Sequence, residues 1–222
     1  LHAEDAVPIL CGGTGLYMRV LLDGIAAIPS IDPTIRESVR AMPTDAAYAC
    51  LLDEDPQRAA QLAPADSQRI ARALEVVRST GRSMLAWQAD THGGIAHRID
   101  LHPLVLLPDR GWVFERCDRR FAMMLAEGGV EEVRALLARD LDRALPVMRA
   151  IGVPEVAAML RGELAREEAI ERGMLSTRQY AKRQFTWFRN QSPSHWPRSR
   201  NETISLPDIF VSLFQKSVDI GA

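Results

Sequence analysis

The sequence predicts an α/β fold with a helix-rich C-terminal half, and three observations carry this prediction. A short apolar run from Val7 to Cys11 ends at two glycines and leads into a segment whose apolar residues recur at helical spacing. A second aliphatic run, His102 to Leu107, has the character of a buried strand. Most of the remaining apolar residues recur every three or four positions, which is typical of amphipathic helices.

The composition is that of a globular protein, with 47% hydrophobic and 25% charged residues. The formal net charge of -2 argues against bulk electrostatic coating of nucleic acid, so any RNA contact must come from local basic faces. The three cysteines are far apart and form no CxxC pair, which indicates neither a zinc site nor a disulfide framework. With no apolar run long enough to span a bilayer, we expect a cytoplasmic protein.

The first expected elements are a strand, a glycine turn and a helix. Thr14 sits in the turn, at the carboxyl end of the expected strand, where open α/β sheets bind ligands. Two glycines after a strand also serve tight turning alone, so this signal is weak by itself. The next segment, residues 28–65, reads as short helices broken by five prolines. It is either a helical insertion or a set of ordinary surface helices.

A long helix is predicted over residues 67–80, capped by Asp66 or Ser67 and ended by Gly81. Its buried stripe is expected to consist of Ile70, Leu74 and Val77. At about 100° per residue, Gln68, Arg69 and Arg72 group on the opposite side. Such a face is usually only solvated, although glutamine and arginine together also suit base edges and phosphates of RNA.

The C-terminal half is predicted to follow the strand at 102–107 with helices over 114–127, 130–138 and 155–160. Ser176 is expected to cap a further helix over 177–190. Arg178, Lys182 and Arg189 share one edge of that helix, and Tyr180 and Trp187 flank it. This pairing is expected for backbone contact plus base stacking, and the alternative is a peripheral helix with ordinary surface cations. The polar tail from 191 to 222 is expected to be poorly ordered.

Five segments, in order, resemble the tRNA dimethylallyltransferase family, also called tRNA isopentenyltransferases. They are PILCGGTGLYMRVLLDG, IPSIDPTIR, DPQRAAQLAPADSQRIARALEVVRSTGR, GGVEEVRALLARDLDRALPVMRAIG and TRQYAKRQFTWFR. The resemblance implies a P-loop NTPase-like parallel-sheet core, incomplete at its N-terminus, with a helical insertion and a helix-rich C-terminal half. On that basis residues 1–27 belong to the core, 28–65 to a tRNA-binding insertion, and 66–190 to the rest of the core and the C-terminal helices.

The resemblance also implies transfer of a dimethylallyl group from dimethylallyl diphosphate to N6 of adenine 37 in the anticodon stem-loop of tRNA. Magnesium is implied as a cofactor, and a monomer is expected. Thr14 and Arg178 are the implied catalytic residues, beside the target amine and on the diphosphate, and we expect them to converge on one pocket. The implied tRNA-binding residues are Arg36, Gln68, Arg69, Ile70, Ala71, Arg72, Arg149, Ala150, Ile151, Gly152, Lys182, Arg183, Gln184 and Arg189. No metal ligand is implied among these positions.

Two departures from the family pattern stand out. The 222 residues contain neither a GxxxxGK[ST] phosphate loop nor the aspartate segment that supplies the family's general base, so we expect an upstream segment and an inactive chain without it. Val153 and Pro154 stand where the family has an aromatic and then a polar residue. Two alternatives remain open: an adenylate isopentenyltransferase that uses a free nucleotide, and a non-catalytic RNA-binding remnant.

Overall fold

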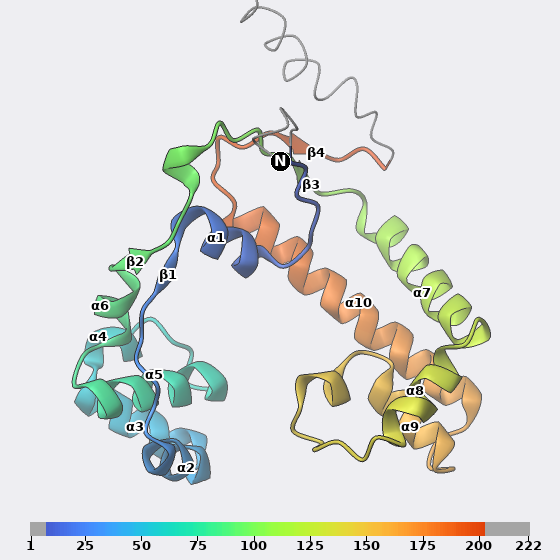
Figure 1. Ribbon diagram of the computed structural model, residues 1–222, viewed down its shortest axis with the longest axis horizontal. Helices are drawn as coiled ribbons and strands as arrows, with labels where there is room; N and C mark the ends of the chain where they lie inside the picture. Colours follow the sequence, from blue (N-terminus) through green and yellow to red (C-terminus); the bar gives the residue numbers. More distant parts are fainter. Residues whose placement is uncertain (1–7, 203–222) are drawn as a thin grey trace, which may run out of the picture. The chain divides into compact units, whose positions relative to one another are not determined.

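The computed structural model describes residues 8–202 and divides into two compact units (Figure 1). Unit 2 comprises Leu16–Leu101, and unit 1 comprises Leu1–Gly15 together with His102–Ala222. Helices dominate both units, and each contains one small sheet of two strands. The predicted mixed α/β, helix-rich class is therefore confirmed.

Unit 2 is organised around helix α5. Its elements are α1 (Gly15–Asp23), β1 (Ile25–Ala26), α2 (Pro33–Ala41), α3 (Thr44–Glu54), α4 (Pro56–Ala59), α5 (Ser67–Thr80), α6 (Met84–Gln88), β2 (Thr91–His92) and the 3₁₀ helix η2 (Ala96–Arg98). The first residue of α1, Gly15, is assigned to unit 1. Strands β1 and β2 pair antiparallel. The short helices expected between residues 28 and 65 are α2, α3 and α4, and two of them begin at a proline.

The predicted helix over 67–80 matches α5 at both ends. The Asp66 side chain accepts a hydrogen bond from the backbone N–H of Arg69, and Gly81 ends the helix with a φ of 65°. Ile70 and Leu74 are fully buried against Leu51 of α3 and Val39 of α2. The apolar stripe of α5 therefore forms the core of unit 2, as the sequence predicts.

Unit 1 is built on the long helix α10. Its elements are β3 (Val105–Leu106), α7 (Arg110–Ala126), α8 (Gly129–Leu137), the 3₁₀ helix η3 (Pro146–Arg149), α9 (Val153–Leu160), α10 (Arg166–Gln191) and β4 (Arg198–Ser199). Helix α7 runs beside α10 and the two pack closely, as Figure 1 shows. A Cβ added at Gly173 of α10 would fall 1.9 Å from the Phe121 ring of α7, so glycine permits this approach.

One expectation about a helix of unit 1 is wrong. Ser176 does not cap a helix, because α10 begins ten residues earlier, at Arg166, and the Ser176 hydroxyl donates to Glu155 at 2.8 Å instead. The segment before Ser176 contains good helix formers and an ion pair between Glu168 and Arg172 four residues apart, so nothing stops the helix there.

None of the helices within residues 8–202 has the length and apolar character needed to cross a membrane.

The two predicted strands are present only in small part. Residues 8–11 have no regular secondary structure, and Val7 lies outside the described residues. The run 102–107 forms strand only at Val105 and Leu106, paired parallel with Arg198 and Ser199. A strand requires a partner for its backbone groups, and in the described part of unit 1 only β4 supplies one. Residues 191–202 of the expected tail are described and include β4, whereas 203–222 lie outside.

Candidate functional site

The predicted site residues fall into two groups, one in each unit. Unit 1 carries Thr14, Arg149 to Gly152, Arg178, Lys182 to Gln184, and Arg189. Unit 2 carries Arg36 and Gln68 to Arg72.

The turn that carries Thr14 rests on helix α10. A Cβ added at Gly13 would lie 2.3 Å from Nε2 of Gln184, and one added at Gly15 would lie 2.1 Å from the Trp187 ring. Gly15 is therefore required for the close approach to the Trp187 ring, whereas the atom met at Gly13 is the end of a flexible side chain that can shift. Thr14, between them, is exposed. The turn thus has a packing role, and it presents the threonine hydroxyl at the surface.

Arg178 lies in the middle of α10 and is paired with a carboxylate that the sequence did not single out. Its Nη1 donates to Oδ2 of Asp118 on α7 at 2.9 Å, and the two side chains are 36% and 27% exposed. Asp118 Oδ1 is buried without a hydrogen-bond partner. Burial raises the pKa of the neighbouring Cys117 thiol, and the Asp118 carboxylate raises it further. A raised pKa favours the protonated thiol of Cys117 at neutral pH.

Thr14 and Arg178 are held by contacts on different sides of α10. At about 100° per residue, Gln184 and Trp187 lie about 120° and 180° around the helix from Arg178. The glycine turn packs on Gln184 and Trp187, whereas the Arg178 side chain contacts Asp118 on α7. The contacts of the described residues therefore do not join the two, and their convergence on one pocket stays a prediction.

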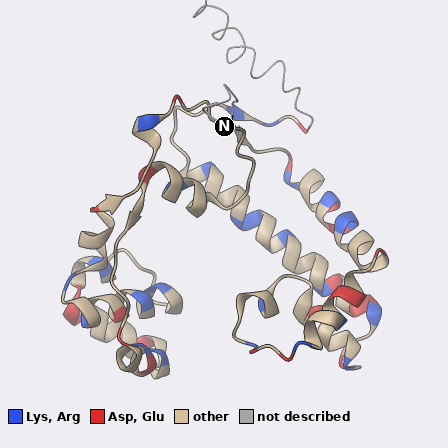
Figure 2. Ribbon diagram, in the orientation of Figure 1, with Lys and Arg blue, Asp and Glu red and all other residues tan. Residues whose placement is uncertain are grey.

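The residues of α10 that were predicted to contact tRNA differ in their solvent exposure and in their side-chain contacts. Figure 2 shows basic positions recurring along this helix. Lys182 and Arg183 are exposed, and the Arg183 guanidinium lies 5.6 Å from the Tyr180 ring. The Gln184 side chain packs against Gly13 of the glycine turn. Trp187 packs against Gly15 and is half-buried, so its ring does not offer the free stacking face that the sequence suggests. Tyr180, 40% exposed, retains that possibility.

The segment from Arg149 to Gly152 forms a loop anchored on α10. Gly152 has a φ of 99°, and its N–H donates to Oε2 of Glu155 at 3.0 Å. The other oxygen of Glu155 accepts from Ser176 of α10. Arg149, Ala150 and Ile151 are exposed on this loop. Val153 and Pro154, the departure from the family pattern, are the first two residues of α9.

In unit 2, only part of the segment from Gln68 to Arg72 can offer its side chains to a ligand. Gln68 and Arg69 are exposed, and the Arg72 side chain is 40% exposed. Ile70 is fully buried in the core and Ala71 is half-buried beside it. Arg69 also pairs with Asp66 at 3.3 Å. The polar residues therefore face outward while Ile70 fixes the helix that carries them.

Arg36 lies on α2, which packs against α5 through a buried carboxylate. Oε1 of Glu75 on α5 pairs with Nε of Arg40 on α2 at 2.5 Å, and Oε2 lies 3.6 Å from Nη1 of Arg72. Glu75 is 1% exposed. Neither Glu75 nor Arg40 was among the predicted site residues, although one glutamate inside the apolar run ALEVV was the available signal. Two of the predicted groups, on α2 and α5, are thus neighbours.

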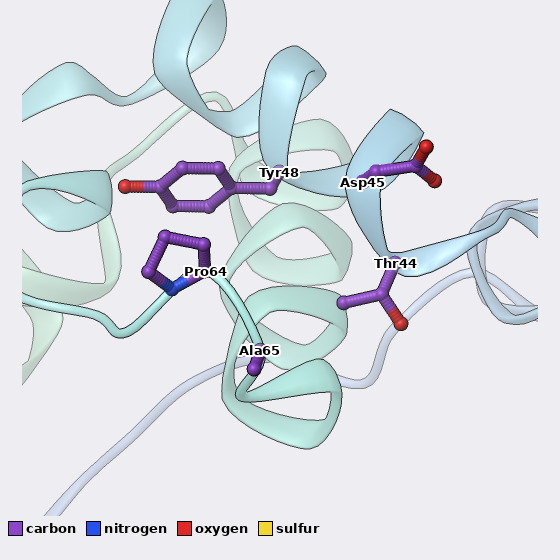
Figure 3. A pocket seen from close by; sticks show the side chains of 5 residues that line it. All are labelled: Thr44, Asp45, Tyr48, Pro64 and Ala65. Atoms are coloured by element: carbon purple, nitrogen blue, oxygen red, sulfur yellow. The ribbon is translucent and has the colours of Figure 1, made fainter.

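A depression of about 530 Å³ lies elsewhere on unit 2. It is lined by Thr44, Asp45, Tyr48, Pro64 and Ala65, and Figure 3 shows the Tyr48 ring beside Pro64. None of these residues was predicted to belong to a site, and none of the predicted residues lines it.

Across residues 8–202, no three His, Cys, Asp or Glu side chains gather where they could hold a metal ion. The magnesium that the resemblance implies is therefore not assigned to residues of this chain.

The family model described as IPP transferase matches residues 1–191. The chain belongs to this family. A tRNA dimethylallyltransferase of Novosphingobium aromaticivorans is 62% identical over 197 residues, which are 89% of this chain and 70% of that protein. One of Erythrobacter litoralis is 58% identical over 214 residues, or 96% of this chain and 68% of the relative.

Solved structures agree with this membership. The chain is similar to a tRNA isopentenylpyrophosphate transferase of Bacillus halodurans, with a TM-score of 0.59 and 27% identity over 98% of this chain and 68% of the other. It is also similar to a eukaryotic dimethylallyltransferase acting on tRNA, with a TM-score of 0.63 and 26% identity over 84% of this chain and 48% of the other. The resemblance drawn from five sequence segments is therefore confirmed.

Proposed function

We propose that this chain carries the tRNA-binding and leaving-group-binding parts of a tRNA dimethylallyltransferase. The complete protein transfers a dimethylallyl group from dimethylallyl diphosphate to N6 of adenine 37 in tRNA. The observation that carries the proposal is the identity of 58% or more to relatives bearing this name, across most of the chain. The exposed arginines of α5 and α10 supply the physical means of holding a polyanionic substrate.

The reaction is a substitution at an allylic carbon. The bond from carbon 1 to the diphosphate oxygen breaks with its electron pair, so negative charge accumulates on the leaving group. The adenine amine forms the new carbon–nitrogen bond and loses one proton. Arg178 is the proposed stabiliser of that charge, because a guanidinium with one donor held by Asp118 keeps further N–H groups for phosphate oxygens.

Thr14 is proposed to lie beside the target amine. Its hydroxyl can accept from or donate to the edge of an adenine, and the adjacent Gly15 packs closely against the Trp187 ring. The adenine must leave its stack to reach such a group, since the amine of a stacked base is not accessible to the chemistry. The acceptor of the amine proton is not assigned to a residue of this chain.

The same proposal covers the type of core fold, the roles of the chain segments, the cellular compartment and the oligomeric state. The parallel pairing of β3 with β4 supports a P-loop NTPase-like parallel core, of which these strands form a small part. Residues 28–65 are proposed as the tRNA-binding insertion, residues 1–27 and 66–190 as core and C-terminal helices, and 191–222 as a polar tail. A tRNA substrate favours a cytoplasmic enzyme, and one chain carrying both kinds of predicted site favours a monomer.

The direct test uses the protein expressed from its complete coding region. We expect incubation with dimethylallyl diphosphate, magnesium and unmodified tRNA to give isopentenyladenosine in the tRNA. Adding AMP in excess separates this activity from that of an adenylate isopentenyltransferase, which would prenylate AMP and leave the RNA unmodified. Binding of tRNA without any product would favour the RNA-binding remnant and reject the proposal.

A further inference from the structure

Glu75 is a carboxylate buried on the polar face of a helix. Gln68, Arg72, Glu75 and Ser79 recur at spacings of four and three residues along α5, opposite its apolar stripe. Glu75 is nevertheless 1% exposed, because α2 covers this half of the face. The Asp32 N–H donates to Oγ of Ser79 at 3.3 Å at one end of α2, and Arg40 reaches Glu75 at the other. The N-terminal half of the face, with Gln68 and Arg72, remains open.

The charges around Glu75 do not cancel. A buried carboxylate is costly unless it is paired, and Arg40 supplies the pairing hydrogen bond. Arg72, at 3.6 Å, adds a second positive charge without a hydrogen bond to Oε2. Arg40, Arg72 and Glu75, two guanidiniums and one carboxylate, thus carry a net charge of +1 as a group.

Arg40 is placed to do more than neutralise Glu75. Its side chain is 57% exposed, and Nε is the donor that Glu75 uses. The two terminal nitrogens therefore remain on the solvent side, and a guanidinium presenting two parallel N–H groups matches the oxygens of a phosphate. Arg36 lies one turn earlier on the exposed side of α2. The anchor on Glu75 reduces the conformational freedom that Arg40 would otherwise lose on binding.

We propose that Arg40 is a further RNA contact, a phosphate-binding residue held in place by Glu75 and acting with Arg36 and Arg72 across the junction of α2 and α5. This rests on the proposed function, since it takes tRNA as the ligand. The opposing interpretation is that Arg40 only balances the buried charge of Glu75. The two interpretations differ in what happens when both charges are removed together.

The test is the salt dependence of tRNA binding by the complete protein, measured for the wild type and for Arg40→Gln/Glu75→Gln. The double variant keeps the net charge and leaves no buried carboxylate without its partner. We expect weaker binding by several-fold and a slope of log K against log salt that is smaller by about one, because one phosphate contact is lost. Wild-type affinity and slope in the double variant would overturn the proposal.

A matched control comes from unit 1. Arg161 Nε pairs with Glu163 Oε1 at 2.6 Å, and both side chains are about half exposed. Arg161→Gln/Glu163→Gln removes a solvent-exposed arginine–glutamate pair at positions with no proposed RNA contact, so its slope should equal that of the wild type. A loss of slope there as well would show a general charge effect and count against Arg40.

A second variant keeps the proposal falsifiable if the double variant does not fold. Arg40→Lys retains a charge for Glu75 but loses the fork of parallel donors, so tRNA affinity should fall several-fold while the thermal midpoint stays near that of the wild type. Unchanged affinity would overturn the proposal. If the wild type itself neither binds nor prenylates tRNA, the proposed function fails instead, and the two failures are thereby distinguished.

Discussion

At the scale of single residues, Asp118 is the hydrogen-bond partner that holds Arg178. Because one oxygen of Asp118 holds Nη1 of Arg178, we expect Asp118→Asn to lower turnover several-fold in the complete enzyme while tRNA affinity stays unchanged. The measurement is kcat alongside the tRNA Kd. Glu168→Gln is the control, because it weakens an exposed pair with Arg172 on the same helix and should leave both values unaltered. Equal turnover in Asp118→Asn and wild type would remove Asp118 from the account.

Asp32 couples the stability of unit 2 to pH. Hydrogen bonds from the Thr34 hydroxyl and from the backbone N–H groups of Thr34 and Ile35 lower the pKa of its carboxyl. A folded-state pKa below the unfolded value near 3.9 gives stability that is present above that pH and is lost as pH falls through the lowered pKa. We therefore expect Asp32→Asn to melt below the wild type at pH 7 and the gap to close below about pH 4. A gap independent of pH would contradict this.

Gly173 governs packing at the scale of elements. A methyl group there would overlap the Phe121 ring, so Gly173→Ala should lower the free energy of unfolding by roughly 1–3 kcal/mol through overpacking of α7 on α10. Chemical denaturation measures the change. Phe121→Leu added to Gly173→Ala should recover part of the loss. Gly12→Ala, at a glycine with nothing within 4 Å of its added Cβ, should change little. Similar losses in both alanine variants would exclude the steric explanation.

The elements that could be predicted from sequence are those with local start and stop signals. Helix α5 was predicted because Asp66, Gly81 and the apolar stripe all act within the helix itself. The start of α10 was missed because Ser176 looks like a cap, and only its contact with Glu155 shows that it serves another purpose. The strands were overestimated because a strand depends on a partner far along the chain, as Val105 depends on Arg198.

The site residues follow the same rule. Exposed basic residues such as Arg69 and Lys182 are recognisable from helical periodicity, because their face is set locally. Asp118 and Glu75 could not be found that way, since their importance comes from which helix packs on them. Family resemblance supplied roles for Thr14 and Arg178 but not the carboxylate that holds the arginine.

The whole molecule should unfold as two cooperative units if the division at Leu16 and Leu101 reflects separate cores. Leu74→Ala removes a fully buried side chain from the core of unit 2 and should cost about 2–5 kcal/mol there. In native-state hydrogen exchange, amides of α5 and α3 should lose protection while those of α7 and α10 keep it. An equal loss throughout would show a single cooperative core.

The central claim is that Arg178 of α10 binds the diphosphate whereas the exposed arginines of α5 bind tRNA, and two-substrate kinetics on the complete enzyme tests it most directly. Arg178→Gln should lower kcat at saturating tRNA by at least ten-fold with little change in tRNA Kd, because its partner is the diphosphate leaving group. Arg69→Gln, an exposed α5 variant, should raise the tRNA Kd and KM and leave kcat near the wild-type value. If both variants raise the tRNA Kd equally and kcat is unchanged in Arg178→Gln, the proposed division of labour is wrong.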